Sequence, residues 1–224
     1  MTIAMSMKTT KSLSRRWLLA SGACATVAAL CPVSAAERLR QTPTQMLGPF
    51  YPLEKPLDDD ADLTMVKGRK ARAKGQVVHV MGRILNPHGE PVKDAQVEIW
   101  QANANGRYTH PGDNNPAPLD PNFEGYAKLV SDADGRYRFK TIKPAGYRAG
   151  DIMRPAHIHF CVTGRINRLI TQMYFPGDPK NANDVVMATA AKDRHMLMAE
   201  ILAPSADLEP HSLLARWDIV LEQG

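Results

Sequence analysis

The sequence predicts an all-β protein, an antiparallel β-sandwich with long loops, an extended N-terminal arm and one short C-terminal helix. Two observations predict this class. Short runs of alternating apolar and polar residues recur along the chain, and clusters of glycine, proline, asparagine and aspartate separate them. One segment, residues 190–201, instead repeats apolar residues at helical spacing. The 224 residues are an ordinary length for one soluble domain.

The expected strands follow one another from Gly75 onward, where the composition changes. Residues 86–91 and 132–135 are strong turn signals between them. The loop over residues 103–122 is long and irregular, and such a loop in a compact domain is usually functional or disordered. The expected strands cover residues 77–82, 97–100, 126–130, 136–142, 157–163, 169–175 and 217–221.

Residues 1–36 have the layout of an export signal. A basic start without acidic residues is followed by an apolar stretch and then by small residues. Arg15 and Arg16, with Ser14 before them and leucines after, resemble a twin-arginine signal, so we expect export to the periplasm. An ordinary secretory leader is the alternative. The apolar stretch is too short for a permanent span, so we expect no membrane span in the mature chain.

Removing this leader changes the charge and the cysteine count. The leader carries four positive charges and no negative one, so the net charge of +5 for the whole chain falls to +1. The basic composition therefore gives no argument for nucleic acid as a partner. Cys24 and Cys31 lie in the leader, which leaves Cys161 alone, and we expect no internal disulfide. Lipid attachment at a leader cysteine stays open.

Residues 37–74 are expected to form an extended arm. Several prolines, an acidic run at 58–60 and a basic run from 67 to 74 oppose regular structure there. The sandwich is then expected to occupy residues 75–224.

The densest chemical signal is His157-Ile158-His159 on an expected strand. Side chains alternate between the faces of a strand, so His157, His159 and Cys161 share one face, and their apolar neighbours can enter the core. Two adjacent imidazoles are a natural metal chelate. The alternative is a pair of hydrogen-bonded histidines with no metal, and the motif by itself does not choose between them.

Two histidines would hold a metal incompletely. Cys161 lies about 7 Å beyond His159 on an extended strand, too far for one ion to bridge easily. Tyr108, inside the long loop, and Tyr147, just before the histidines, are other candidates. Two phenolates with two imidazoles suit Fe(III), because a hard trivalent ion stabilises the bound phenolates. The alternatives are tyrosines packed in the core, and a zinc hydrolase that uses Asp151.

Several segments, taken together and in order, resemble the catalytic domain of intradiol ring-cleavage dioxygenases. The likeness is strongest to the iron-bearing beta subunits of the protocatechuate 3,4-dioxygenases, and the segments cover more than half of the chain beyond the leader. They are residues 97–104 with 106–108, 117–123, 141–144, 154–160, 169–175 and 216–221.

The resemblance implies a non-haem Fe(3+) enzyme that inserts both atoms of O2 into a catechol-type aromatic and gives a cis,cis-muconate-type diacid. By this resemblance Tyr108, Tyr147, His157 and His159 are the metal ligands. Tyr147 also acts as a general base, Arg154 stabilises negative charge on the ring, and Gln172 orients its neighbours. The alternatives are a salt bridge for Arg154 and a strand hydrogen bond for Gln172. A secreted β-sandwich that binds a ligand without catalysis is the competing function.

Two further features bear on the pocket and on assembly. Residues 47–52 resemble the Gly-Pro-aromatic segment that lines the substrate pocket in this family, which implies substrate contacts from Pro49, Phe50 and Tyr51. A proline-rich spacer is the alternative. In the protocatechuate enzymes that segment belongs to the alpha subunit, so we expect a homo-oligomer here rather than an alpha/beta pair. The family's loop after the tyrosine is longer and holds a tryptophan where this chain has Ala149, so the identity of the catechol stays open.

Overall fold

Two β-sheets packed face to face form the sandwich that the alternating sequence predicts. The computed structural model describes residues 38–55 and 60–222. The expected leader and part of the acidic run lie outside the described residues. The buried core lies between the sheets and draws apolar side chains from both, among them Val80 and Phe139 from one sheet and Ile158 and Phe160 from the other.

The first sheet has five strands and is mixed rather than purely antiparallel. β1 pairs antiparallel with β4, but it pairs in parallel first with β10 and then with β11. Gly82 in β1 makes room for this, because a Cβ there would lie 1.8 Å from the Trp217 carbonyl oxygen. The strands are β1 (Val77–Leu85), β4 (Arg136–Ile142), β9 (Glu200–Leu202), β10 (Leu213–Arg216) and β11 (Ile219–Val220).

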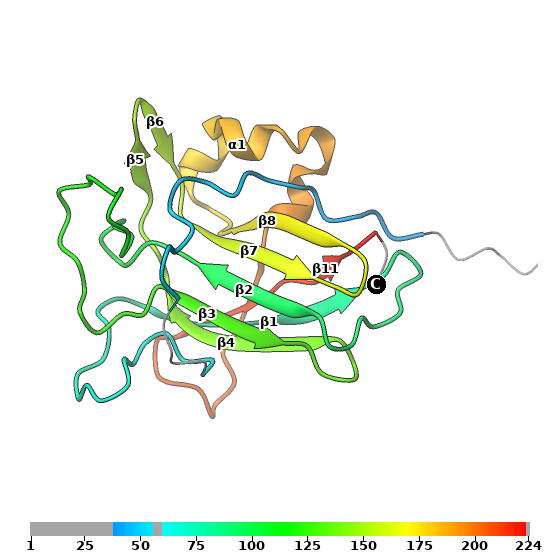
Figure 1. Ribbon diagram of the computed structural model, residues 1–224, viewed down its shortest axis with the longest axis horizontal. Coiled ribbons are helices and arrows are strands. Elements are labelled where there is room, and N and C mark those ends of the chain that lie inside the picture. The colour runs from blue at the N-terminus through cyan, green and yellow to red at the C-terminus, as the bar shows by residue number, and fades with distance from the viewer. Residues whose placement is uncertain (1–37, 56–59, 223–224) are drawn as a thin grey trace, which may run out of the picture. The chain divides into compact units, whose positions relative to one another are not determined.

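The second sheet is antiparallel and has the order β3-β2-β7-β8. Its register places Trp100 opposite His159, and His159 opposite Gln172, so these side chains share the face turned away from the core. The strands are β2 (Gln96–Trp100), β3 (Tyr126–Val130), β7 (His157–Thr163) and β8 (Arg168–Tyr174). A separate ribbon joins β5 (Tyr147–Ala149) to β6 (Ile152–Arg154) and lies at the same end of the sandwich as the long loop 101–125 (Figure 1).

The structure confirms one short α-helix in the C-terminal part of the chain, but this helix lies before the predicted range, residues 190–201. A 3-10 helix, η2 (Ala191–Leu197), occupies most of it, and Glu200 begins strand β9. Ala191 has a positive φ of 48°, which an α-helix cannot contain. The α-helix is a single short turn, α1 (Val185–Ala188), preceded by the 3-10 helix η1 (Pro179–Asn183). In the described part of the chain, no helix is long and apolar enough to cross a membrane.

The N-terminal arm crosses the outer face of the second sheet. In Figure 1 it runs along β8 and then turns past one end of β7, β2 and β3. Its backbone is tied down there, because Gln45 N donates to the Ile170 carbonyl at 2.8 Å and Thr171 Oγ1 donates to the Pro43 carbonyl at 2.8 Å. The arm therefore covers the face that carries His157 and His159.

Candidate metal centre

Four side chains from three parts of the chain converge at one end of the second sheet. Tyr108 comes from the loop after β2, Tyr147 begins β5, and His157 and His159 lie on β7. The Tyr108 hydroxyl is 3.1 Å from His159 Nε2, which is 3.2 Å from His157 Nε2. The rings of Tyr108 and Tyr147 meet edge to face with centroids 5.2 Å apart. The structure thus brings together the four residues that the sequence analysis named as ligands.

Local contacts fix the two histidine rings. His157 Nδ1 lies 2.8 Å from the Pro155 carbonyl, and a carbonyl can only accept, so Nδ1 carries the proton. His157 Nε2 is then a bare lone pair directed at the centre. Trp100, opposite His159 in the register, stacks on the His159 ring with centroids 4.8 Å apart and an interplanar angle of 13°.

One close approach between two loops brings the tyrosines together. A Cβ on Gly106 would lie 2.7 Å from the Gly146 carbonyl oxygen, so the loop before Tyr108 can approach the segment before Tyr147 only because residue 106 is glycine. The Tyr108 backbone N–H also donates to Asp113 Oδ2 at 2.7 Å. The long loop is therefore ordered around Tyr108, as its length and irregularity suggested for a functional loop.

Burial sets the protonation of these groups. Burial raises the pKa of Tyr108 well above its usual value, and the neighbouring Tyr147 adds to this. Burial also raises the pKa of Tyr147, against the opposing effects of the Tyr108 hydroxyl and Arg154. Burial and the Arg154 charge lower the pKa of His157 to about 3, and burial together with the neighbouring His157 lowers the pKa of His159. Both imidazoles are thus neutral lone-pair donors, and the phenols need a cation to ionise.

The donor set fits a hard trivalent cation. Two Nε2 atoms face each other at 3.2 Å, and His159 Nδ1 is buried without a hydrogen-bond partner among the described residues. A cation held by these two histidines would satisfy both lone pairs, and it would favour the two phenolates, whose hard oxygens suit Fe(III) better than a soft ion.

The other candidate ligands do not join this cluster. Cys161 Sγ accepts a hydrogen bond from Arg168 Nε at 3.0 Å. Asp151 is exposed in the turn between β5 and β6. Within the described residues no three histidine, cysteine or acidic side chains gather as a metal site. Among these residues, a metal at the two histidines would therefore need the tyrosines.

A buried polar network lies beside the donor set. Arg154, which is 4% exposed, donates from Nε to Asp184 Oδ2 at 2.6 Å and from Nη2 to Gln172 Oε1 at 2.7 Å. Arg154 Nη2 also lies 3.1 Å from the Tyr174 hydroxyl. The structure thus joins Arg154 directly to Gln172 beside the donor set.

Sequence reasoning missed Asp184 and Tyr174. Each had a usable signal. Asp184 precedes the apolar run of residues 185–188, which is the pattern of a helix N-cap. Tyr174 follows Gln172 by two residues on one strand, so the two side chains share a face. Nothing local in the sequence, however, indicated that Asp184 contacts Arg154.

The arm supplies the covering residues of the centre. The Phe50 ring packs on Tyr108, with centroids 4.8 Å apart, and on Tyr147 at 6.0 Å. Tyr51 meets Trp100 edge to face at 5.0 Å and donates from its hydroxyl to Glu98. Pro49 is exposed, whereas Gly48, with φ of +79°, lies so close to His159 that a Cβ would be 3.1 Å from Cε1.

A cavity of about 360 Å³ adjoins the Phe50 ring. Ala149 and Gly150 form a wall with no large side chain, and Arg148 supplies a cation. The other lining residues belong to the ordered loop after Tyr108. They are Gly112, Asp113, Asn114, Asn115 and Pro116.

Comparison with known sequences identifies the relatives of this chain. A family model described as dioxygenase matches residues 46–223. The beta chain of protocatechuate 3,4-dioxygenase from Burkholderia cepacia is 44% identical over 193 residues, which cover 83% of this chain and 79% of that protein. Catechol 1,2-dioxygenase from Acinetobacter baylyi is 32% identical over 177 residues, which cover 66% of this chain and 50% of that enzyme. The chain thus spans about half of such catechol enzymes.

Solved structures have the same fold. The catechol 1,2-dioxygenase of Pseudomonas arvilla superposes with a TM-score of 0.64 at 27% identity, covering 82% of this chain and 62% of that enzyme. The 3-chlorocatechol 1,2-dioxygenase of Rhodococcus opacus superposes with a TM-score of 0.65 at 22% identity, covering 81% and 72%. The second likeness supports the fold alone.

Proposed function

This chain belongs to the intradiol ring-cleavage dioxygenase family, and we propose from that premise that it opens a catechol-type ring between the two hydroxyl-bearing carbons. Both atoms of O2 enter the product, a cis,cis-muconate-type diacid. The observation that carries the proposal is the meeting of two tyrosines and two facing imidazole nitrogens in one buried cluster. A binding module would have no need for such a cluster.

The family uses non-haem Fe(III), and we propose that Tyr108, Tyr147, His157 and His159 hold it here. Bound ferric iron would supply the Lewis acidity that ionises a catechol and the electron acceptance that makes the ring reactive toward O2. The rest of the proposed chemistry belongs to the side chains.

Tyr147 is the proposed base for one of the two catechol protons. Its phenolate oxygen would accept the proton, and burial favours the resulting neutral phenol because it raises the pKa of Tyr147. The Phe50 ring over Tyr108 and Tyr147 helps to exclude water from this transfer.

Arg154 is the proposed stabiliser of negative charge on the substrate. Its guanidinium is buried beside the donor set and acts on both tyrosines and both histidines. A fixed positive charge in a water-poor site stabilises developing anions without reorganisation. Gln172 accepts from Arg154 and donates to the Met46 carbonyl at 2.9 Å, so it would hold the guanidinium against the arm.

The cavity beside Phe50 supports a ring-substituted catechol as the substrate. Its volume of about 360 Å³ falls in the range of small-molecule sites. Because Arg148 lines it, an anionic substituent such as the carboxylate of protocatechuate would gain a charge-assisted contact. Asp113 also lines the cavity, but it accepts hydrogen bonds from the backbone of Tyr108 and Asn115.

Oxygen uptake by the iron-loaded protein tests the function and the substrate class together. Catechol, 4-methylcatechol and protocatechuate form the panel, and the product made under 18O2 is identified by mass and absorption. We expect a diacid with two labelled oxygen atoms and the highest kcat/KM for protocatechuate. Arg148→Gln should lower the ratio of kcat/KM for protocatechuate to kcat/KM for catechol about tenfold. No oxygen uptake with any member, or a semialdehyde product, would overturn the assignment.

We further propose that one kind of chain suffices and assembles with its own copies. The arm of the chain lies over its own His159 and Tyr108, so no second type of subunit is needed to cover the centre. Light scattering on the single-gene product, together with its oxygen uptake, tests this. Activity that appears only after a second type of subunit is added would contradict it.

Export by the twin-arginine route is also a proposal, and it rests on Arg15 and Arg16 in the basic, acid-free leader. An Arg15→Lys/Arg16→Lys variant should accumulate in the cytoplasm, whereas the unaltered chain should reach the periplasm. Equal distribution of the two between fractions would argue for an ordinary secretory leader.

A further inference from the structure

Asp184 carries a buried carboxylate whose two oxygens serve different parts of the molecule. Its side chain is 0% exposed. Oδ2 accepts from Arg154 Nε at 2.6 Å, and Oδ1 accepts from the Met187 backbone N–H at 2.6 Å as the N-cap of α1. We propose that Asp184 is a positioning residue that holds the Arg154 guanidinium at the donor set, an inference that rests on the proposed function.

Arg154 needs such an anchor because its side chain is long and flexible. Its charge can stabilise the substrate only if the guanidinium stays beside the donor set. An arginine side chain samples many rotamers and loses much of that freedom when it is fixed in one orientation. Gln172 and the Tyr174 hydroxyl both lie at Nη2, and Asp184 is the one partner of Nε among the described residues. Contacts at two points of a planar group fix its orientation, whereas contacts at Nη2 alone would let it rotate.

The two-point anchor also leaves part of the guanidinium available. Nη1 has no hydrogen-bond partner among the residues that the structure describes. With Nε and Nη2 held, this nitrogen is the one that can meet charge on a bound substrate. Without Asp184, Nε would compete for the same charge and the geometry would no longer be fixed.

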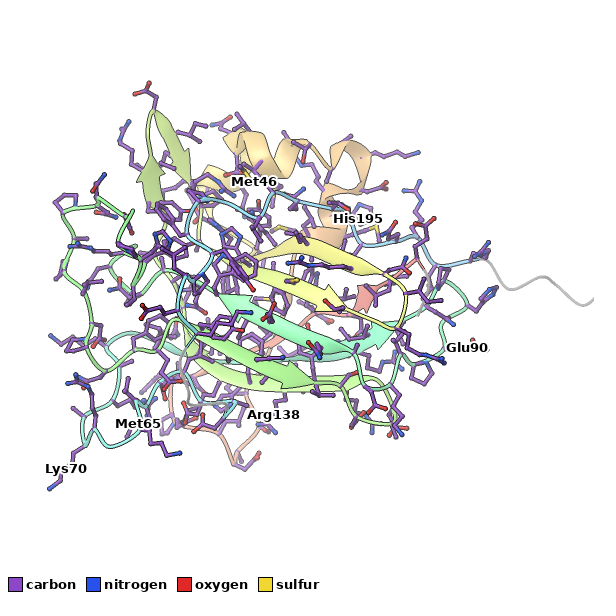
Figure 2. The ribbon with its side chains drawn as sticks, viewed as in Figure 1. Met46, Met65, Lys70, Glu90, Arg138 and His195 are labelled. Atoms are coloured by element: carbon purple, nitrogen blue, oxygen red, sulfur yellow. The ribbon has the colours of Figure 1, made fainter. Side chains whose placement is uncertain are left out.

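The cap geometry fixes Asp184 itself. Asp184 has an extended backbone, with φ of −72° and ψ of 113°, and it begins a turn whose Val186 and Met187 are buried. The same turn meets the arm, because Gln45 Nε2 donates to Thr189 Oγ1 at 3.0 Å, and Gln45 Oε1 lies 3.3 Å from the Tyr174 hydroxyl. The next arm residue, Met46, is labelled in Figure 2. The start of α1, strand β8 and the arm therefore all belong to the hydrogen-bond network around the Arg154 guanidinium.

The competing explanation is that Asp184 only caps α1. Asp178 offers a matched control, because it is the N-cap of the neighbouring η1. It accepts from the backbone N–H of Lys180 and of Ala156, each at about 3 Å, and its hydrogen bonds do not include Arg154. A loss that comes from weakened capping should appear in Asp178→Asn as well as in Asp184→Asn.

The test compares Asp184→Asn, Asp184→Glu and Asp178→Asn in the iron-loaded protein. For Asp184→Asn we expect kcat/KM for protocatechuate to fall about 10- to 100-fold, mostly in kcat, while iron content and the tyrosinate absorption band stay unchanged. Asp184→Glu keeps the charge and should recover part of the loss. Asp178→Asn should stay within about twofold of the unaltered protein.

A second readout needs no turnover. In the iron-free protein, where no paramagnetic ion broadens the signal, the Arg154 Nε–H, buried in an ion pair, should give a slowly exchanging NMR resonance that Arg154→Lys removes and so assigns. Its exchange should accelerate at least tenfold in Asp184→Asn and stay unchanged in Asp178→Asn. If Asp184→Asn does not fold, Asp184→Glu decides by the same exchange measurement.

Unaltered exchange and unaltered kcat/KM in the Asp184 variants would overturn the proposal, as would equal losses in Asp178→Asn. The proposed function fails separately, through absence of oxygen uptake by the unaltered protein, and the exchange measurement would still report whether Asp184 fixes Arg154.

Discussion

Each sheet of the sandwich carries histidine on its outer face, but the histidines of the two sheets have different hydrogen-bond partners. On β1, His79 Nε2 lies 2.6 Å from the Glu209 carboxylate, within a group of ion pairs that also includes Lys140 and Asp62. On β7, His157 and His159 have no carboxylate partner in the part of the chain that the structure describes, and they face each other and Tyr108. Arg138 on the first sheet and Met46 on the arm mark these two sides in Figure 2.

The difference shows what makes a histidine available as a ligand. Both strands alternate in the same way, so strand position does not separate the two kinds. His79 is hydrogen-bonded to the Glu209 carboxylate. The β7 histidines are buried, and among the described residues their Nε2 atoms contact only each other and the Tyr108 hydroxyl. Burial without an acidic partner is therefore the feature that distinguishes the candidate metal ligands.

The largest expected effect comes from removing a histidine from each face. His159→Ala should abolish iron retention and oxygen uptake, because it removes a donor that, unlike Tyr147, is not proposed to leave the metal during the reaction. His79→Ala should keep both and lose about 1 kcal/mol of unfolding free energy, the usual value of one hydrogen bond. Iron content by elemental analysis measures the contrast. Unaltered iron content in His159→Ala would remove it from the ligand set.

The next effect concerns Tyr147, which serves both as a donor and as the proposed base. Tyr147→Phe removes the hydroxyl and keeps the buried ring, so it should slow catechol binding about 100-fold while most of the iron stays bound. Stopped-flow mixing with a coloured catechol analogue measures the rate, and elemental analysis measures the iron. Loss of all iron would contradict a displaceable role for Tyr147.

Two glycines allow a test of whether the arm positions the metal centre. Gly48 and Gly68 have φ of +79° and +82°, but a Cβ on Gly68 would meet nothing within 4 Å, whereas one on Gly48 would crowd His159. Gly48→Ala and Gly68→Ala should each lose about 1 kcal/mol for the left-handed backbone. Gly48→Ala should in addition lower kcat/KM about 3- to 10-fold and shift the tyrosinate band, since small displacements at a site are costly. Equal spectra and activities for the two variants would show that the arm does not press on the centre.

The smallest effect belongs to the exposed face. The His79 contact, outweighing the effect of burial, lowers the pKa of Glu209 to about 2. A carboxylate whose pKa is lowered by folding stabilises the folded state above its unfolded pKa, and this contribution is lost as pH falls from about 4.5 toward 2. Because Glu209 is partly exposed, Glu209→Gln should cost only about 0.5 kcal/mol at pH 7, and most of this cost should be gone at pH 2, where the carboxyl is about half protonated. Urea unfolding at both pH values measures it, and a difference that persisted undiminished at pH 2 would contradict the assignment.

Local patterns predicted most of the sandwich. Alternation located β1 to β4, β7 and β8, because each has one face in the core and needs no distant information to be recognised. The parallel pairing of β1 with β10 and β11 joins residues more than 130 positions apart, and no local pattern specifies it. The three-residue strands β5, β6 and β9 are too short to show a period. The apolar spacing around Leu197 predicted a helix, but Glu200–Leu202 gains a partner in β10 instead.

The residues of the metal centre also divide into those that a local sequence pattern predicts and those that depend on distant contacts. Alternation alone placed His157 and His159 side by side, since both lie on one strand. The contribution of Tyr108 and Tyr147 came from the resemblance to a family, because their approach depends on Gly106 fitting against Gly146 across some 40 residues. Asp184 lies 30 residues from Arg154, and the contact forms only once η1 and α1 have turned the chain back.

Trp100 stacks on the His159 ring, so its fluorescence should respond to a metal ion bound at that histidine. Three tryptophans occur in the sequence, and Trp17 belongs to the segment expected to be removed. Trp217 packs on Phe160 in the core instead. Indole fluorescence from Trp100 should therefore be quenched when a ferric ion binds at the stacked imidazole, while that of Trp217 stays comparatively bright. The ratio of emission before and after adding iron would then report occupancy without any substrate.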